Sequence, residues 1–215
     1  MRERASGQGS HGAAMEAARR AVALDARAVQ AVAEQIDDSF LRAALLVRGC
    51  KGKVLVAGMG TSGATARRLA HLLSCAGTPS LFIHAADALH GTLGAVASTD
   101  IVIVISKGGE SDELNEFVRR ARVCGAKTVA LTSAAKSSLA RQSDLKIVTV
   151  FPEDADPGGV MAMGSSLGFS AVGDALVVSL MTLRGYGRSL RRLLFLHPGG
   201  AVGKRAASTR QGGSV

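Results

Sequence analysis

The chain alternates between short apolar runs and stretches in which hydrophobic residues recur every three or four positions. The short runs have the composition of buried strands, and the longer stretches have the spacing of amphipathic helices that pack on a sheet. The pattern predicts strands at residues 54–57, 81–83, 101–105, 128–131 and 145–150, and helices at residues 63–75, 110–123 and 136–141.

Helices also flank this alternation. Apolar residues at helical spacing between residues 15 and 47 are interrupted near Asp37, Asp38 and Ser39, residue types that favour the start of a helix. A long apolar helix is predicted at about residues 165–184. Strands that alternate with helices form right-handed crossovers, so we expect an α/β fold with a parallel sheet of five strands covered by helices on both faces.

Length and composition fit one domain with short appendages. The 215 residues are 47% hydrophobic and 20% charged, which is enough apolar material for a well-covered core. We expect a disordered leader rich in Gly and Ser at residues 1–14, a single domain at residues 15–203, and a basic flexible tail at residues 204–215. Within the domain, residues 15–50 form the N-terminal helices, and residues 51–203 form the sheet core and the closing helices.

Cysteine usage and the apolar segments indicate a cytoplasmic protein. Cys50, Cys75 and Cys124 are widely spaced, which fits reduced thiols better than a disulfide framework or a metal site. The leader lacks the apolar core of a signal peptide. The apolar stretch at residues 171–183 is interrupted by glycine and polar residues and is shorter than the roughly 20 residues of a membrane span. We therefore expect no membrane partner.

The net charge of +9 comes largely from the end of the chain. All charged residues from Arg184 onward are basic. Neither interleaved aromatic residues nor a known nucleic-acid motif accompanies them, so the pattern favours a solvated basic tail or general attraction for anions over a nucleic-acid partner.

The turn after the first predicted strand has the spacing of a phosphate-binding loop. Residues 58–63 follow the pattern G-x-G-x-x-G between a strand and a helix, where bare backbone amides can approach a phosphate. A dinucleotide site would also need an acid at the end of the second strand, but Ile83 and His84 stand there. A tight turn that needs glycine and binds no ligand is the alternative.

A second polar turn, at residues 106–113, also follows a buried strand and opens a helix. It offers two hydroxyls, exposed amides and the cation of Lys107. Thr132 and Ser133 follow the next strand. Because ligands of such sheets bind at the carboxyl ends of the strands, these turns together predict a hydroxyl-lined cup for one anion. Ser111 would also be explained as a helix cap.

These segments resemble the SIS (sugar isomerase) domain family, and within it the arabinose-5-phosphate isomerase branch. The resemblance covers roughly residues 51–204. It rests, in order along the chain, on Gly58-Met59-Gly60-Thr61-Ser62-Gly63, Ala76-Gly77-Thr78-Pro79, His90-Gly91-Thr92-Leu93-Gly94, Gly109-Glu110-Ser111, Gly173-Asp174-Ala175-Leu176 and His197-Pro198-Gly199-Gly200-Ala201-Val202-Gly203.

The resemblance implies a three-layer αβα sandwich of flavodoxin-like or Rossmann-like type around a five-stranded parallel sheet. It also implies a sugar phosphate as the small-molecule partner and a homo-oligomer, either a tetramer or a dimer, with active sites shared between subunits. Isomerases of this branch often continue into paired CBS regulatory domains, which we expect this protein to lack.

Aldose–ketose isomerisation moves a proton between adjacent carbons through an enediol, so it needs a base near neutral pKa and a shuttle for hydroxyl protons. The resemblance assigns these roles to His197, Glu113 and Asp154. The ordinary alternatives are a structural histidine, an acid that stabilises the first turn of a helix, and a loop acid. From the turns and the resemblance together, we predict substrate contacts at Gly60, Thr61, Ser62, Gly77, Thr78, His90, Ser106, Lys107, Gly108, Gly109, Glu110, Ser111, Thr132 and Ser133.

No cofactor is expected. His84 resembles a position where some relatives hold an inhibitory zinc, but a single ligand does not make a metal site.

Several positions depart from the family pattern. Thr61 stands where the isomerases place a lysine, Asp154 replaces a glutamate, and Gly108 replaces a serine, while Lys107 brings a positive charge from another direction. The sequence predicts a sugar-phosphate aldose–ketose isomerase, an intramolecular oxidoreductase. The main alternative is a non-catalytic sugar-phosphate sensor, favoured by the missing lysine, and the third is a dinucleotide-dependent enzyme.

Overall fold

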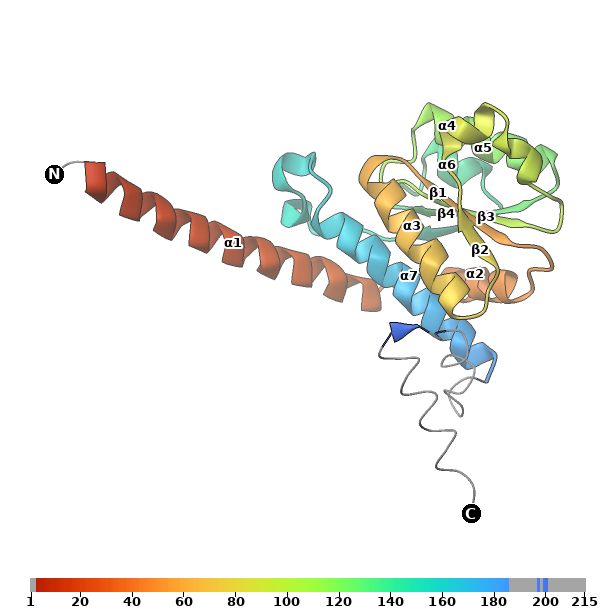
Figure 1. Cartoon of the computed structure of the whole chain (residues 1–215), viewed down its shortest axis with the longest axis horizontal. Coiled ribbons are helices and arrows are strands. Elements are labelled where there is room, and N and C mark those ends of the chain that lie inside the picture. The colour runs from red at the N-terminus through yellow and green to blue at the C-terminus, as the bar shows by residue number, and fades with distance from the viewer. Residues whose placement is uncertain (1–2, 186–196, 198, 201–215) are drawn as a thin grey trace, which may run out of the picture.

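The computed structural model describes residues 3–185, 197, 199 and 200, and its elements follow the predicted alternation (Figure 1). The strands are β1 (Val54–Gly58), β2 (Ser80–Phe82), β3 (Ile101–Ile105), β4 (Lys127–Thr132) and β5 (Leu145–Val148). The α-helices are α1 (Glu3–Ala33), α2 (Asp38–Arg48), α3 (Gly60–Cys75), α4 (Ala85–Leu89), α5 (Asp112–Val123), α6 (Ser138–Gln142) and α7 (Gly164–Leu183). Short 3-10 helices are η1 (Thr92–Ala95), η2 (Glu153–Ala155) and η3 (Pro157–Gly159).

The strands form one parallel sheet in the order β2-β1-β3-β4-β5. From β1 the chain moves to β2 at one edge and then crosses to β3 on the other side of β1. The strand order therefore reverses between β1 and β3, and ligands of open α/β sheets bind at such a reversal, outside the carboxyl ends of the strands. The predicted fold class is confirmed.

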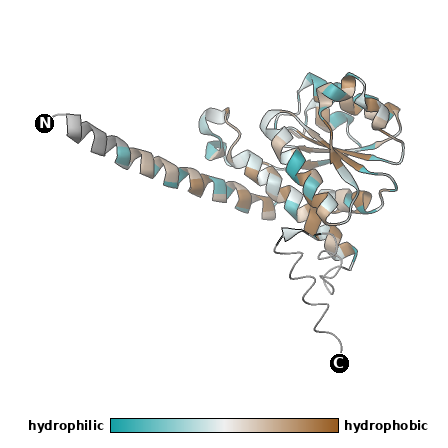
Figure 2. Ribbon diagram, viewed as in Figure 1, coloured by the Kyte–Doolittle hydropathy of each residue, from teal (hydrophilic) through white to brown (hydrophobic). Residues whose placement is uncertain are grey.

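Helices cover both faces of the sheet. One core cluster joins β-strand residues such as Ile103 to α2, α3 and α7, where Val47, Leu73 and Leu176 are buried. The other joins Val104 of the same strand to α5, where Phe117 is fully buried. Neighbouring residues of a strand point to opposite faces, so a continuously apolar strand needs both layers. Figure 2 shows the strands as a hydrophobic centre of the domain.

The helix α1 extends away from the rest of the domain (Figure 1). Its C-terminal part packs on α7 and buries Ala28 and Val32, whereas residues 11–20 are all exposed. Residues 3–14, predicted as a disordered leader, continue this helix. The C-terminal part of α1, which is held on α7, serves as a helix nucleus. Each further residue then adds a backbone hydrogen bond without the cost of forming a second nucleus. The glycines that suggested disorder lie inside this extension.

The helix α7 is long and apolar enough to cross a membrane, by length and composition alone. In this fold it packs against α1, α2 and α3, and Phe169, Leu176 and Leu180 are buried in the core. These contacts explain its apolar composition as that of a central helix in one layer.

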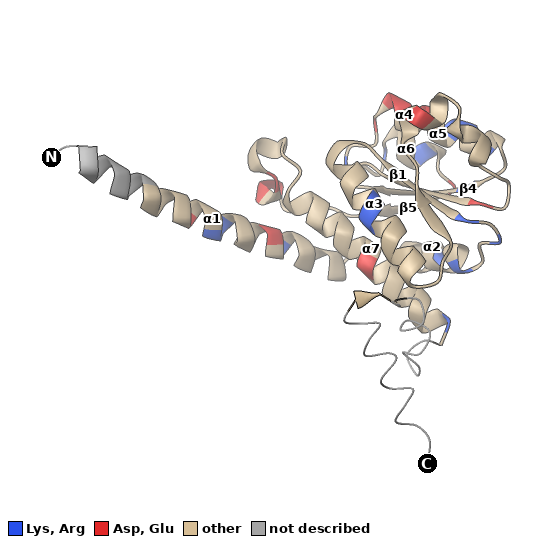
Figure 3. Cartoon of the chain, viewed as in Figure 1, with Lys and Arg blue, Asp and Glu red and all other residues tan. Residues whose placement is uncertain are grey.

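The expected basic tail at residues 204–215 lies outside the described residues. In the described part, basic residues occur on several elements, among them α1, α2, α3 and α5 (Figure 3).

Candidate functional site

The two glycine-rich turns lie side by side at the carboxyl ends of β1 and β3. Gly58, the last residue of β1, is the register partner of Ile105, the last residue of β3. The residues that follow, beginning at Met59 and Ser106, therefore leave the sheet as neighbours at the reversal of strand order. The predicted proximity of these turns is confirmed.

The turn from β1 to α3 is tight, and only glycine fits at its ends. A Cβ added at Gly58 would lie 2.5 Å from the carbonyl oxygen of Ser62, and one at Gly63 would lie 2.9 Å from that of Gly58. Between them, Gly60 has a φ of +52° and faces open space. The first amides of α3 are thus presented beside bare backbone, with no side-chain cap from Met59.

The turn from β3 to α5 is held by its own hydroxyl. The amide of Gly109, which has a φ of +69°, donates to the hydroxyl of Ser106 over 3.1 Å. Ser111 then precedes α5 with extended backbone, yet its side chain does not accept from the helix amides. The capping explanation for Ser111 therefore does not describe its side chain, although Ser111 does occupy the N-cap position.

Hydroxyls of the predicted cup divide into two groups. In the part of the chain that the structure describes, the hydroxyls of Thr61, Ser62 and Ser111 have no hydrogen-bond partner. Those of Thr132 and Ser133 donate to the carbonyl oxygens of Lys107, over 3.0 Å, and of Thr149, over 2.7 Å. Thr132 is also fully buried. The first group can bind a ligand, and the second shapes the turns.

Lys107 lies in the second turn and forms an ion pair that the sequence did not indicate. Its Nζ lies 2.6 Å from Oδ2 of Asp156, which is buried between β5 and α7. Burial raises the pKa of Asp156, but hydrogen bonds from Lys107 and Ser165 outweigh that effect and lower it to about 2. The carboxylate is therefore charged throughout the neutral range.

Two further predicted contacts of this turn differ in their surroundings. Gly108 is exposed and faces open space. Oε1 of Glu110 accepts the amide of Ser138, at the start of α6, over 2.9 Å. Hydrogen bonding by Ser138 lowers the pKa of Glu110. Glu110 thus links the turn to α6, while Gly108 leaves the backbone open to a ligand.

The predicted catalytic residues come from separate elements. Glu113 is exposed in the first turn of α5, directly after the cup. Asp154 lies in η2, after the carboxyl end of β5, and its Oδ2 is 3.2 Å from Nη1 of Arg27. His197 is half-buried and interacts with other residues of the chain. His90 is exposed at the end of α4.

Gly77 and Thr78 lie away from the cup within this chain. They connect α3 to the beginning of β2 and so lie at the amino ends of the strands, opposite the two turns. Thr78 is buried, and its hydroxyl accepts a hydrogen bond from Arg184 over 2.7 Å. The hydrogen bonds from Arg184 to Ala76 and Thr78 hold the end of α7 against the end of α3. The assignment of Gly77 and Thr78 as substrate contacts stays a prediction.

His84 follows β2, and its Nδ1 is buried without a hydrogen-bond partner in the described structure. A carboxylate oxygen of Asp87 lies 3.9 Å from this nitrogen. Residues 3–185, with 197, 199 and 200, include no group of three or more His, Cys, Asp or Glu side chains that could hold a metal ion. His84 thus has no set of co-ligands within this part of the chain.

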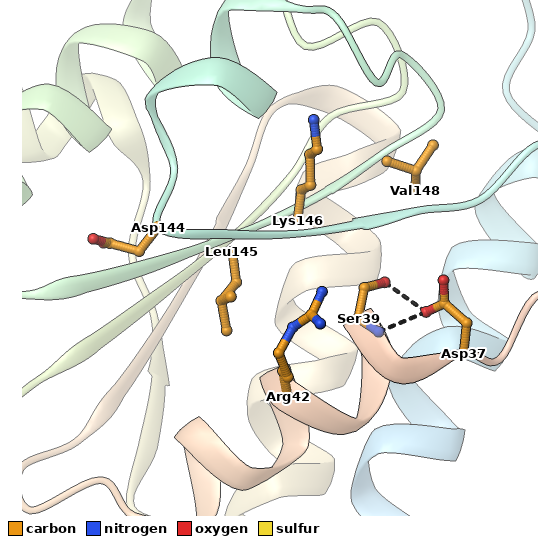
Figure 4. A pocket seen from close by; sticks show the side chains of 7 residues that line it. All are labelled: Asp37, Ser39, Arg42, Asp144, Leu145, Lys146 and Val148. Carbon is orange, nitrogen blue, oxygen red and sulfur yellow. Dashed lines mark hydrogen bonds between the residues drawn. The ribbon is translucent and has the colours of Figure 1, made fainter.

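A hollow of about 390 Å³ opens at the sheet edge beside β5 (Figure 4). It lies between α2 and β5, where Arg42 and Lys146 face it with Leu145 and Val148. Asp37 at its rim is occupied as the cap of α2, because its carboxylate accepts from the amide and the hydroxyl of Ser39. This hollow is separate from the turns that follow β1 and β3.

The chain is similar to proteins of a known family. A family model described as SIS domain matches residues 48–179. The chain is 33% identical over 190 residues to the arabinose 5-phosphate isomerase KdsD of Escherichia coli strain K12, a match that covers 88% of this chain and 57% of that protein. It is 31% identical over 191 residues to KdsD of Pseudomonas aeruginosa, covering 89% of this chain and 58% of the relative. The chain therefore spans little more than half the length of these curated relatives.

One solved structure of similar fold is matched over nearly the whole length of the solved chain. The structure of E. coli CFT073 c3406 in complex with A5P aligns with a TM-score of 0.81 and 32% sequence identity, covering 87% of this chain and 98% of that chain.

Proposed function

The chain belongs to the SIS domain family, and from this premise we propose that it is a sugar-phosphate aldose–ketose isomerase related in substrate to the arabinose 5-phosphate isomerases. The observation that carries the proposal is the pair of turns after β1 and β3, with the hydroxyls of Thr61, Ser62 and Ser111 unpartnered within the described residues. Two helix N-termini and these hydroxyls suit a phosphate, because amides and hydroxyls can replace its water shell.

In the proposed reaction the phosphate anchors the sugar at the cup while its first two carbons lie among Glu113, Asp154 and His197. The base, to which we assign His197, removes the proton from C2 of the aldose and returns it to C1 of the enediol. Carboxylates of Glu113 and Asp154 bind the sugar hydroxyls and carry the proton from the C2 hydroxyl to the C1 carbonyl oxygen. The proton balance closes without a redox cofactor or a second substrate.

The proposal includes a homo-oligomer assembled through α1. Met15, Val22 and Val29 are 58%, 69% and 41% exposed and recur every seven residues along the helix. This repeat keeps them on one side of the helix, and the buried Ala28 and Val32, which pack against α7, lie on a face next to this stripe. An apolar stripe on a projecting helix suits a second copy of the same chain. Figure 2 shows hydrophobic residues recurring along this helix.

We also propose a cytoplasmic location. Cys50, Cys75 and Cys124 are all free thiols, as expected in a reducing compartment, and sugar phosphates are intracellular metabolites.

The test incubates the purified protein with five- to seven-carbon sugar phosphates in deuterated water and follows aldose–ketose exchange by proton NMR. Incorporation of solvent deuterium at C2 supports an enediol isomerase. Thermal stabilisation by a sugar phosphate without exchange would instead favour the sensor, and protection by NAD or NADP would favour a dinucleotide enzyme.

The catalytic assignment is tested with two histidine variants. His197→Ala should abolish turnover and leave most of the sugar-phosphate affinity. His71→Ala is the matched control, because His71 is an exposed histidine on α3 whose Nε2 contacts Cys75. Full activity in the His197→Ala protein would remove His197 from the mechanism.

A further inference from the structure

Both the backbone and the side chain of Lys107 are held by hydrogen bonds. Its carbonyl oxygen accepts hydrogen bonds from the hydroxyl of Thr132 and the amide of Ser133, each over 3.0 Å, which ties its backbone to the end of β4. Its ammonium group lies 2.6 Å from Asp156, after β5. A long and mobile lysine side chain is thus confined beside the cup with its entropy already lost before a ligand arrives.

The carboxylate of Asp156 is a buried hydrogen-bond acceptor. Its Oδ1 accepts the amides of Met163 and Ser165, over 2.9 and 3.0 Å, at the start of α7. Its Oδ2 accepts Lys107 and the hydroxyl of Ser165, the latter over 2.5 Å. Both oxygens are therefore fully used, and the side chain is only 3% exposed. Such a carboxylate has no capacity left for a substrate hydroxyl.

The ammonium group of Lys107 differs in this respect. The side chain is 43% exposed, and an ammonium group has three donors, of which Asp156 takes one. Among residues 3–185 it has no second hydrogen-bond partner. Lys107 can therefore stay anchored to Asp156 and still donate to an anion.

The cup needs a cation of this kind. The first turn of α3 contributes no charge, since Thr61 and Ser62 are neutral, and the first turn of α5 carries the acids Asp112 and Glu113. A phosphate dianion beside two carboxylates is repelled unless a positive charge lies near. Lys107 is the one basic residue of the turn at residues 106–113.

We propose that Asp156 is a positioning residue that fixes the ammonium group of Lys107 at the cup. Lys107 then neutralises the negative charge of the substrate phosphate. The inference rests on the proposed function, because it names the group that balances the phosphate in that same site. It assigns to Asp156 an action through Lys107 only, and no contact with the sugar.

Binding measurements on four proteins test this role: the wild type, Lys107→Met, Asp156→Asn and the double variant. The probes are D-arabinose 5-phosphate and inorganic phosphate, titrated by calorimetry. Lys107→Met should raise the Kd for both probes roughly tenfold or more, because it removes a charge-assisted hydrogen bond. Asp156→Asn should raise it less. Its remaining carbonyl oxygen can still accept the amides of Met163 and Ser165, so the hydrogen bonds at the start of α7 remain.

The double variant separates positioning from general damage. If Asp156 acts through Lys107, the double variant should have the Kd of Lys107→Met, whereas independent effects would multiply. Lys107→Arg, which keeps a cation, should restore most of the affinity.

The chain offers a matched control at the other end of the sheet. Lys53 forms a comparable pair with the buried Asp100, over 2.7 Å, at the amino ends of β1 and β3. Lys53→Met should lower the melting temperature and leave the Kd unchanged.

Each outcome decides between the two claims. A wild type that binds no sugar phosphate overturns the proposed function and this inference with it. A wild type that binds, together with an unchanged Kd in Lys107→Met or multiplied effects in the double variant, overturns the inference and leaves the proposed function standing.

Discussion

Arg27 in α1 and Asp154 in η2 form an ion pair of 3.2 Å across 127 residues of sequence. It connects the projecting helix to the segment that holds a proposed catalytic carboxylate. Both side chains are more than half exposed, so the pair contributes little to folding. The ion pair instead restricts the orientation of the Asp154 carboxylate.

The first prediction separates orientation from stability at this pair. Arg27→Ala should change the free energy of unfolding by less than about 1 kcal/mol, because exposed ion pairs contribute at most that much. It should lower kcat several-fold, because Asp154 loses the partner that restricts its rotamer. Urea unfolding and NMR exchange assays measure the two effects. Arg19→Ala, which removes an exposed arginine near Glu16 in the same helix, is the control. Equal kcat values in both variants would contradict the prediction.

The second prediction contrasts two hydroxyls of the cup. Ser111→Ala should leave the free energy of unfolding within about 0.5 kcal/mol, since its side chain does not cap α5, and should weaken sugar-phosphate binding. Thr132→Val should do the reverse. It removes one of the two hydrogen bonds to the carbonyl oxygen of Lys107 and leaves the amide of Ala134 without its partner, which costs roughly 1–3 kcal/mol. Unfolding curves and calorimetric titration on both variants provide the comparison. A large loss of stability in Ser111→Ala would show that its hydroxyl supports the fold.

The third prediction concerns acid stability. The pKa of Asp156 is lowered from 3.8 to about 2 in the folded chain, so the unfolded chain binds the proton more readily. At about 1.4 kcal/mol per unit, this difference contributes about 2 kcal/mol of stability that is fully present above roughly pH 4. It is lost as the pH falls from about 4 towards 2.

Urea unfolding of the wild type and Asp156→Asn at a series of pH values checks this assignment. The wild type should be more stable at pH 7, and its advantage should shrink by about 2 kcal/mol as the pH approaches 2. Curves that stay parallel over this range would assign the acid sensitivity to other carboxylates.

Periodicity was sufficient to predict the centre of the sheet because β1, β3 and β4 are buried on both faces. The run at residues 101–105 coincides with β3, since an uninterrupted apolar run has sharp ends. The short helix α4 at Ala85–Leu89 was missed, because five residues are too few to show a helical period. The proximity of the two turns followed from the rule that parallel strands end at one edge.

The individual contacts could not be predicted in the same way. Lys107 and Asp156 are 49 residues apart, and a sequence without an alignment does not show which distant charges pair. Thr132 lies at a strand end as predicted, but its hydroxyl donates a hydrogen bond to the carbonyl oxygen of Lys107. The position of Thr78 was open to prediction, because a residue that shortly precedes a strand lies at the amino edge of a parallel sheet.

The fourth prediction tests the exposed side of α1 as a contact between copies of the chain. Val22 and Val29 are seven residues apart on this side, and each is more than two-fifths exposed. If a second copy covers them, Val22→Glu combined with Val29→Glu places two carboxylates in an apolar interface. Burying an unpaired charge is costly enough to break such an interface. Light scattering after size exclusion should then show the mass of the monomer for the variant and a multiple of it for the wild type.

The control for this experiment is Val123→Glu at the end of α5, where the valine is 80% exposed and lies on another helix of the sandwich. It adds the same charge to an exposed valine away from α1, so its mass should equal that of the wild type. Circular dichroism should show an unchanged helix content in all variants, because glutamate favours helices at least as well as valine does. A wild type that is monomeric at micromolar concentration, or a double variant that keeps the wild-type mass, would contradict an interface on α1. A monomer that still isomerises sugar phosphates would further show that the turns after β1 and β3 form a complete site within one chain.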